Sequence, residues 1–529
     1  MPAEVKKETM LVNVIGAKCV GIEAVPVTVE VDIAGGIGIH LVGLGDVAVR
    51  ESLLRILTAL QAKGFHIPGK KIVINLAPAD IHKSGSGYDL PIALGIIAAS
   101  GQRDLARLDR FLVMGELGLD GSVRPVPGAL PMVELAVRKG LEGCILPADS
   151  ALEAVDYAPE QTWSVRTLED VLRILDEGDG GADLRVDSQT SLAGPRPAPL
   201  PSYMDFSEII GQEGAKRGLE IACAGGHNVI MIGTPGSGKS SLARALAGIL
   251  PPMTREESVQ TSKVYSVAGR GRLRSGLMRE RPFRAPHYSA SLAAIVGGGG
   301  GENVQPGEIS LAQNGILFLD EYGQAPASVL EALRGPLEDR KVVISRLRSK
   351  VEFPASFMLV AASNPCPCGY YGEGDRCRCT PGRRAAYLAR LRGPLIDRID
   401  IQLYVHSLPA ARLVGRGSRK GAQESSAEVA ARVARAREIQ RRRFEGEGIF
   451  TNAEMGSRQM NRFCPLSASC NETLESVVDR FGLSARACSR MVKIARTIAD
   501  LEGREDIRPE HLLEASAYRF LDRRDVLDF

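Results

Sequence analysis

The sequence has no long hydrophobic run and no strong excess of either charge. No apolar stretch in its 529 residues approaches the roughly 18 to 20 uninterrupted residues that cross a bilayer. The opening segment, MPAEVKKETMLVNV, lacks the apolar core of a signal peptide. These absences predict a cytoplasmic protein with no membrane partner. Lys and Arg number 66 against 63 Asp and Glu, so any polyanionic partner has to bind a local basic patch.

The chain is too long for one ordinary domain, and 44% of its residues are hydrophobic, enough to bury several cores. Short β-like runs alternate with helical stretches in the first part, a polar segment rich in Gly, Asp, Ser and Pro follows, and a second α/β region precedes a helical end. The predicted units are an α/β domain at 1–175, an exposed linker at 176–204, an α/β domain at 205–412, a polar loop at 413–427 and a helical domain at 428–529.

The segment NVIMIGTPGSGKSS, residues 228–241, is an apolar strand that runs into a complete G-x-x-x-x-G-K-[ST] pattern and then a helix. Such glycines let backbone N–H groups surround a phosphate, while Lys239 neutralises the β/γ charge and the Ser240 hydroxyl ligates Mg²⁺. The flanking strand and helix disfavour the alternative, a plain glycine-rich turn. The segment therefore predicts an ATP site formed by Gly233, Thr234, Pro235, Gly236, Ser237, Gly238, Lys239, Ser240 and Ser241.

An acidic pair at the end of a buried strand should complete such a site, and GILFLDEYG, residues 315–323, supplies one. Asp320 is expected to hold Mg²⁺ through its water shell, and Glu321 to polarise the attacking water. The alternative is an exposed acidic turn after a core strand. A further buried strand, SFMLVAASNP, ends at Ser363 and Asn364, which are expected to touch the γ-phosphate or the lytic water.

Four of the ten cysteines lie between residues 366 and 379. In a reducing compartment, clustered cysteines are interpreted as metal ligands in preference to disulfides. Cys366, Cys368, Cys377 and Cys379 could close a tetrahedral, structural Zn²⁺ site, although C-x-C is tighter than the usual spacing. A redox role and unliganded thiols are the alternatives. Arginines and tyrosines nearby could also let this segment touch nucleic acid; they are Tyr370, Tyr371, Arg376, Arg378, Arg383 and Arg384.

The segment DRKVVISRLRSKVEFP, residues 339–354, alternates cationic and apolar residues. On one extended strand Arg346, Arg348 and Lys350 would share a face. We expect a basic hairpin arm whose cations track a DNA backbone, with a solvated charged loop as the alternative. The arginine-rich segment 266–290 is a second candidate for the same role.

The order of phosphate loop, LFLDE, AASNP and LRGPLIDRIDI resembles that of AAA+ ATPases. Within it PFRAPHYSAS, GGGGENVQPGEISLAQNGILFLDE, NPCPCGYYG and ARTIADL closely resemble the magnesium-chelatase-like group called YifB or ComM. The resemblance extends through all three domains. It implies an AAA+ P-loop α/β/α core with inserts, a C-terminal helical lid, and a homo-oligomeric, hexameric ring with active sites between subunits. In that ring the hairpin and segment 266–290 would face the central pore.

The resemblance also implies roles for two arginines. Arg398 corresponds to the arginine finger that reaches a neighbour's γ-phosphate, and Arg486 to the sensor 2 arginine of the lid. Cationic charge at these places offsets the negative charge of phosphoryl transfer. The sequence alone does not choose Arg398 over Arg392, or Arg486 over Arg490.

The first domain resembles the S5-type proteolytic fold of Lon through residues 75–100 and 114–140. Gly87 stands where the nucleophile belongs and Pro131 where the lysine belongs, and neither can do that chemistry. Lys83, Ser84 and Ser86 lie close enough in sequence to keep a protease as an alternative. The resemblance otherwise implies a scaffold that helps form the ring or binds DNA.

Taken together, the resemblance implies a ring-forming, Mg²⁺- and ATP-dependent DNA motor. It would act as a helicase or in branch migration of single-stranded or branched recombination intermediates during DNA uptake. A chelatase-like remodeller that acts on a protein partner is the first alternative, and an active Lon-type protease the second.

Overall fold

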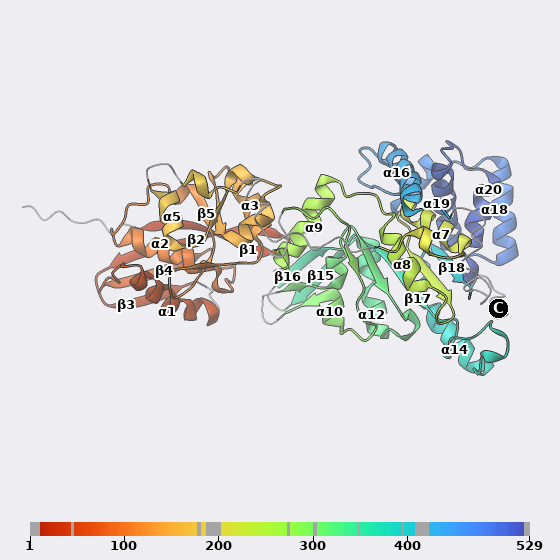
Figure 1. Cartoon of the computed structure of the whole chain (residues 1–529), viewed down its shortest axis with the longest axis horizontal. Helices are drawn as coiled ribbons and strands as arrows, with labels where there is room; N and C mark the ends of the chain where they lie inside the picture. The colour runs from red at the N-terminus through yellow and green to blue at the C-terminus, as the bar shows by residue number, and fades with distance from the viewer. Residues whose placement is uncertain are drawn as a thin grey trace, which may run out of the picture.

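The structure is a computed structural model that describes residues 11–43, 47–176, 181–186, 203–271, 276–299, 304–346, 349–393, 395–407 and 423–522. These residues form an N-terminal α/β unit, a central unit around a parallel sheet and a C-terminal helical unit, arranged in a row (Figure 1). Among them, no helix combines the length and apolar character needed to cross a bilayer. The predicted mixed α/β fold class is confirmed.

The N-terminal unit is built on a seven-stranded mixed sheet in the order β3-β4-β2-β1-β5-β8-β9. Its strands are β1 (Val12–Val20), β2 (Glu23–Ala34), β3 (Gly38–Val42), β4 (Lys71–Ala77), β5 (Phe111–Val113), β8 (Gly143–Pro147) and β9 (Thr162–Val165), with a small hairpin of β6 (Glu116–Leu117) and β7 (Val123–Arg124). Its helices are α1 (Val47–Ala62), α2 (Asp89–Ala99), α3 (Ala129–Arg138), α4 (Ala148–Ala151) and α5 (Leu168–Leu175). Helix α2 is apolar on all sides and is therefore buried almost completely.

Part of the predicted exposed linker packs on this unit instead. Val186 is buried, and its N–H group donates to the Thr162 carbonyl at 2.9 Å. The Arg185 guanidinium lies 4.7 Å from the centre of the Trp163 ring. Residues 181–186 therefore contact the edge strand β9, which offers unpaired backbone groups and an indole face, while Ala182, Asp183 and Arg185 stay exposed as expected. The rest of the linker from 187 to 202 lies outside the described residues.

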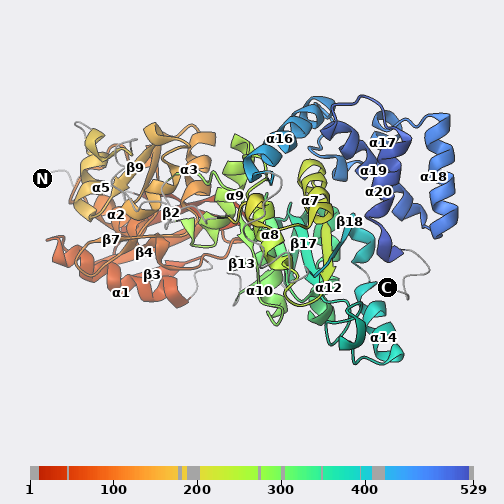
Figure 2. The same ribbon diagram turned by 45° about the vertical axis from the view of Figure 1, so that its right-hand side comes forward.

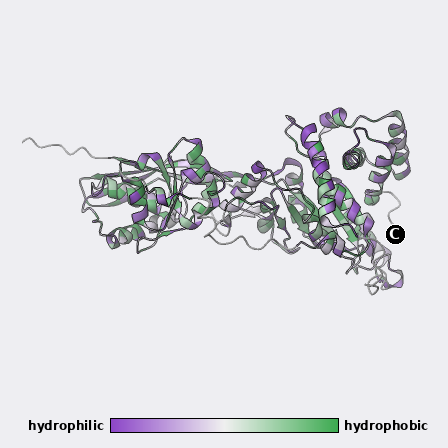
Figure 3. Cartoon of the chain, turned by 45° about the horizontal axis from the view of Figure 1, so that its top comes forward, coloured by the Kyte–Doolittle hydropathy of each residue, from purple (hydrophilic) through white to green (hydrophobic). Residues whose placement is uncertain are grey.

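The central sheet has five parallel strands in the order β11-β14-β17-β10-β18. They are β10 (Val229–Gly233), β11 (Phe283–Arg284), β14 (Ile316–Leu319), β17 (Met358–Ser363) and β18 (Ile401–Val405). Helices cover the sheet, so its strands are continuous apolar runs, and Figure 3 shows strands of both sheets largely in green. The carboxyl ends of parallel strands meet at one edge, where ligands bind in open α/β sheets.

The other elements of the central unit are helices and small hairpins. The helices are α7 (Glu213–Gly225), α8 (Lys239–Ala247), α9 (Arg255–Val267), α10 (Leu292–Val296), α11 (Glu308–Leu311), α12 (Ala327–Ala332), α13 (Arg334–Asp339) and α14 (Pro381–Leu391). The hairpins pair β12 (Gly297–Gly298) with β13 (Gln305–Pro306), and β15 (Lys341–Arg346) with β16 (Ser349–Pro354).

The C-terminal unit consists of helices, as its apolar spacing predicts (Figure 2). They are α16 (Ser426–Arg443), α17 (Ser457–Phe463), α18 (Ala468–Phe481), α19 (Ala485–Leu501) and α20 (Pro509–Ala517). Ser425 caps α16, where its hydroxyl accepts from the Glu428 N–H and the Glu428 carboxylate accepts in return. The buried face of α19, which includes Met491 and Ile498, packs in one core with residues of α7.

Helix α9 connects the N-terminal and central units, and both Figure 1 and Figure 2 show it between them. The buried Lys263 ammonium group donates to Glu23 at 2.5 Å and to Glu134 at 2.6 Å, both in the N-terminal unit. The Ser266 carbonyl accepts from the Gly128 N–H at 2.9 Å. Gly21, in the β1–β2 turn, lies against the Glu352 carbonyl of β16, so the N-terminal unit also touches the base of the predicted basic hairpin.

Candidate nucleotide site

The phosphate loop joins β10 to α8 at the carboxyl edge of the central sheet. Gly236 and Gly238 have φ angles of 79° and 96°, a left-handed conformation that glycine adopts without strain. The Lys239 ammonium group donates to the carbonyls of Gly233 at 2.7 Å and Thr234 at 2.9 Å. Burial lowers the pKa of Lys239, and the charge of Asp320 opposes that shift. The loop thus encloses a cation at a helix N-terminus, an arrangement suited to phosphate.

The acidic pair and the neighbouring strand meet this loop. The Ser240 hydroxyl donates to Asp320 at 3.1 Å, so the two expected Mg²⁺ residues lie together although 80 positions separate them. The Asn364 side-chain oxygen lies 3.4 Å from the Lys239 nitrogen. Hydroxyl and carboxylate oxygens are the ligands that Mg²⁺ prefers, so these residues fit a magnesium nucleotide.

Two residues beside the site have constrained positions. Glu321 has a φ angle of 51°, uncommon for a residue other than glycine and typical of functional sites, and its N–H donates to Asp320 at 2.9 Å. Ser363 is buried, and its hydroxyl lies 3.0 Å from that of Tyr387 on α14. At the polar end of β17, Asn364 therefore contacts Lys239 of the phosphate loop, whereas Ser363 contacts Tyr387 on α14.

Arg398 lies at the opposite edge of the sheet. It precedes β18, whose first residue, Ile401, pairs with Val229 at the start of β10. The Asn228 side chain donates to the Arg398 carbonyl at 3.0 Å. At about 3.3 Å per residue, the length of β10 separates this edge from the phosphate loop by roughly 15 Å. Arg398 is therefore remote from the phosphate loop of its own chain.

Arg486 lies at the same edge as Arg398. Both line a cavity of about 330 Å³ together with Glu338, Asp397, Arg490 and Lys493. The exposed Arg486 guanidinium lies 3.3 Å from Asp397, and the buried Arg398 forms an ion pair with Glu338. This cavity brings together the two predicted arginines, and Arg392 is not among the residues that line it.

Arg490 has a different setting from Arg486. It bonds to the buried Asp400, which also contacts the buried His227 ring at 3.2 Å. Burial alone would raise the pKa of Asp400, but Arg490 and His227 outweigh it and hold that pKa well below its usual range. The structure thus assigns Arg490 to an internal ion-pair network, whereas Arg486 remains at the surface.

The two candidate DNA segments differ from expectation. The expected hairpin is present, because β15 and β16 pair antiparallel. The register pairs Arg346 with Ser349 and Ser345 with Lys350, so Arg346 and Lys350 lie on different strands and not on one face of a single strand as predicted. Arg348 and the side chain of Arg346 lie outside the described residues. Lys350 is exposed, with Glu352 at 3.9 Å.

In segment 266–290, Arg281 and Arg284 are paired with acidic residues, whereas Arg270 and Arg279 are exposed. Arg281 forms an ion pair with Glu257 at 2.8 Å, and Arg284 with Glu308 at 2.6 Å. These arginines lie 24 positions from their partners, so no local pattern could have indicated the pairing.

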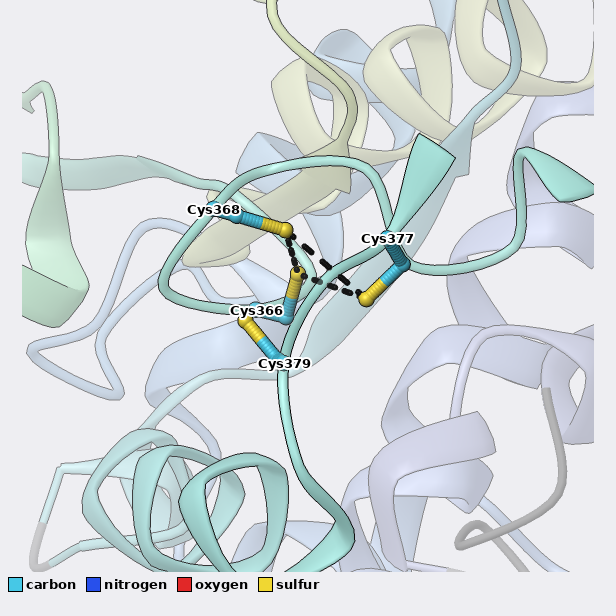
Figure 4. Close-up of side chains that lie close together, drawn as sticks. All are labelled: Cys366, Cys368, Cys377 and Cys379. Atoms are coloured by element: carbon cyan, nitrogen blue, oxygen red, sulfur yellow. Dashed lines mark hydrogen bonds between the residues drawn. The ribbon is translucent and has the colours of Figure 1, made fainter. Parts of the chain in front are cut away.

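The four clustered cysteines come together at one point (Figure 4). Their sulfur atoms all lie within 4.8 Å of one another, and Cys366, Cys368 and Cys377 are separated by 3.4, 3.8 and 3.7 Å. A backbone hydrogen bond from Tyr370 lowers the pKa of Cys368 to about 6, whereas burial raises the pKa of Cys366 to about 12. Arg376 and Arg384 lie over the rings of Tyr370 and Tyr371, at 4.3 and 4.5 Å.

The residues considered for protease chemistry have other partners. The buried Lys83 donates to the Pro78 carbonyl, and Ser86 donates to Glu116. A Cβ atom at Gly87 would lie 3.0 Å from the Met114 side chain and 3.3 Å from that of Val126. The pocket that a nucleophile would need at Gly87 is therefore filled by apolar atoms.

Three residues near the phosphate loop or the cavity that Arg398 lines had no sequence prediction. Glu373 accepts hydrogen bonds from Thr234 at 3.5 Å and from Ser407. Tyr387 supports Ser363, and Glu338 pairs with Arg398. Each lies on a segment remote in sequence from its partner, so its role became visible only once the chain was folded.

Comparison with known proteins matches families over most of the chain. The family described as magnesium chelatase, subunit ChlI matches residues 205–413, subunit ChlI of Mg-chelatase matches 29–150, and the ChlI C-terminal family matches 423–519. The chain is 42% identical to YifB of Salmonella typhimurium over 95% of its length and 96% of that protein. It is also 42% identical to the competence protein ComM of Haemophilus influenzae, with the same coverage. The magnesium-chelatase 38 kDa subunit of Cereibacter sphaeroides is 27% identical over 38% of this chain and 58% of its own.

Proposed function

Because the chain belongs to the YifB and ComM family of magnesium-chelatase-like proteins, we propose that it is a ring-forming, Mg²⁺- and ATP-dependent DNA motor. The motor acts as a helicase or in branch migration of recombination intermediates. The observation that carries the ATPase part is the meeting of Lys239, Ser240, Asp320 and Asn364 at one edge of the sheet.

In hydrolysis these residues bind and orient the nucleotide. The N–H groups of the phosphate loop and Lys239 would hold the phosphates, and Ser240 and Asp320 would hold Mg²⁺. The metal neutralises charge on the phosphates when it is bound. Glu321 accepts a hydrogen bond from the attacking water, and Asn364 positions that water or the γ-phosphate.

The placement of the arginines supports a ring. Arg398 and Arg486 lie at the edge of the sheet away from their own phosphate loop, beside one cavity. In a ring with head-to-tail interfaces, that cavity faces the nucleotide of the next subunit. Both cations then offset the negative charge of the transition state in trans. We propose a hexamer on the basis of the family.

The DNA part rests on the ComM relative, whose name denotes competence, and on the exposed Lys350 in the β15–β16 hairpin. Exposed cations on a hairpin can track a phosphate backbone without reading its sequence. Arg346 and Arg348 complete this proposed contact.

The test is ATP hydrolysis by the full chain with and without single-stranded or forked DNA. Glu321→Gln should reduce turnover about 100-fold or more, because it removes the group that polarises water. Lys350→Glu should keep the basal rate and lose part of the stimulation by DNA. Lys139→Glu, an equal charge change at an exposed site on the N-terminal unit, serves as the control and should behave like the parent. Turnover that ignores DNA in the parent would contradict the DNA motor.

The second candidate is a chelatase-like remodeller of a protein partner, favoured by the local similarity to the magnesium-chelatase 38 kDa subunit. Under this hypothesis the protein still hydrolyses ATP, but its substrate is a protein partner and not DNA. ATP turnover that responds to no DNA, with Glu321→Gln still inactive, would favour it.

A further inference from the structure

We propose that Cys366, Cys368, Cys377 and Cys379 bind one Zn²⁺, and that this ion holds a loop against the phosphate loop, so that zinc loading sets the affinity for nucleotide. The link to affinity rests on the proposed nucleotide site, whereas the metal site does not.

The sulfur geometry fits zinc. Zn–S bonds of about 2.3 Å in a tetrahedron place neighbouring sulfur atoms about 3.8 Å apart. The three sulfur–sulfur separations among Cys366, Cys368 and Cys377, 3.4, 3.8 and 3.7 Å, lie near that value and far from the roughly 2.05 Å of a disulfide. Cys379 completes the set within 4.8 Å. In Figure 4, Cys366 and Cys368 at the start of the loop lie beside Cys377 and Cys379 at its end, and their four sulfur atoms gather between these two segments.

The loop has little else to hold its shape. Among its described residues from 366 to 380, only Cys366 and Gly369 are buried, and its regular structure is one short 3₁₀ turn, Gly374–Arg376. A segment with so little apolar core needs a cross-link to keep one conformation. Four thiolates on one metal supply it, and because they leave no open coordination position, the ion is structural.

The same loop lies directly on the phosphate loop. Gly369 has a φ angle of 86°, and a Cβ atom there would lie 2.8 Å from the Pro235 ring, so its backbone packs against that ring. Glu373 accepts a hydrogen bond from the Thr234 hydroxyl at 3.5 Å. Two residues of the cysteine loop thus touch two residues of the phosphate loop. Release of the metal would free this support and leave the nucleotide-binding loop less well positioned.

The experiment measures zinc and nucleotide affinity separately on the full chain. Metal content is measured by mass spectrometry in the parent, in Cys377→Ser/Cys379→Ser, and in Cys488→Ser, whose cysteine lies on α19 outside the cluster. Affinity for a fluorescent ATP analogue is measured for the same proteins, and for the parent after zinc is removed with a chelator and after ZnCl₂ is added back.

We expect about one zinc per chain in the parent and in Cys488→Ser, and almost none in the double variant. Loss of zinc should weaken nucleotide binding about fivefold or more. When ZnCl₂ is added back to the chelator-treated parent, its nucleotide affinity should return to the original value. Glu373→Gln should retain zinc and weaken binding to a smaller extent, because it alters one contact and leaves the metal site intact.

Two results would overturn the inference. A parent without zinc, whose cluster thiols titrate as free or are joined in disulfides, would refute the metal site. A zinc-free protein that binds nucleotide as tightly as the parent would refute the coupling. Failure of the parent itself to bind nucleotide would instead refute the proposed function, and the zinc measurement would still stand.

Discussion

The position of Arg398 predicts that two inactive variants restore each other's activity. Arg398 lies about 15 Å from the phosphate loop of its own chain, across the length of β10, whereas Lys239 lies within that loop. In the proposed ring each active site takes Lys239 from one subunit and Arg398 from the next. Arg398→Ala alone should reduce turnover about a thousandfold or more, the typical cost of removing an arginine finger, and Lys239→Ala alone should abolish it.

Mixing the two variants in equal amounts creates some complete sites. A site works only where an Arg398→Ala subunit supplies the phosphate loop and a Lys239→Ala subunit supplies the arginine. Random assembly places them in this order at about one interface in four, so the mixture should recover up to about a quarter of parental turnover per site.

The assay is steady-state ATP hydrolysis at constant total protein. The matched control mixes Lys239→Ala with the double variant Lys239→Ala/Arg398→Ala, which contains no intact phosphate loop and should stay inactive. Inhibition of the parent by excess Lys239→Ala establishes that subunits exchange. If subunits exchange and the first mixture still shows no recovery, Arg398 does not act in trans and the reasoning from strand direction is refuted.

Three further predictions concern the metal, the internal network and the unit interface. Asp320→Asn should raise the Mg²⁺ concentration for half-maximal turnover about 10- to 100-fold, and a magnesium titration with unchanged midpoint would remove Asp320 from the metal site. Asp400→Asn should destabilise the protein by about 1.5–3 kcal/mol at pH 7, because it removes the buried carboxylate that pairs with the partly exposed Arg490 and with the buried His227. Since the pKa of Asp400 is held low, its contribution is present at neutral pH and lost as pH falls below about 4, so urea unfolding should show the gap between parent and variant narrowing there; a constant gap would contradict the network. Lys263→Met should weaken the α9 contact with Glu134 by about 2 kcal/mol and separate the melting of the N-terminal unit from the rest in calorimetry, whereas an unchanged single transition would show that the ion pair does not join the units.

Local patterns predicted much of the fold and of the nucleotide site. The apolar runs before Gly233 and Asp320 became parallel strands of one sheet, and the helical spacing after residue 426 became α16 and α19. Such features are readable because strand, loop and helix preferences depend on neighbours in sequence. The pairing of Ser240 with Asp320 followed from the general rule that parallel strands end at one edge.

The wrong predictions arose where distant segments meet. Alternation in the basic segment predicted that Arg346 and Lys350 share one strand face, whereas they lie on the two antiparallel strands β15 and β16. The contact of residues 181–186 with the edge strand β9 and Trp163 was not predicted, because these partners are not local in sequence. The choice between Arg486 and Arg490 was likewise beyond the sequence, since it depends on the burial of Asp400.

The sequence by itself determined the chemistry that this protein has available: a phosphate loop, an acidic strand end, four thiols and a pair of candidate arginines. Only the tertiary structure decided where that chemistry is applied. It placed the phosphate loop and Arg398 at opposite edges of one sheet, and it laid the cysteine loop on Pro235. The physical reason is that residue type and spacing set reactivity and local conformation, whereas strand direction and burial set which groups, remote in the chain, come within reach of one another.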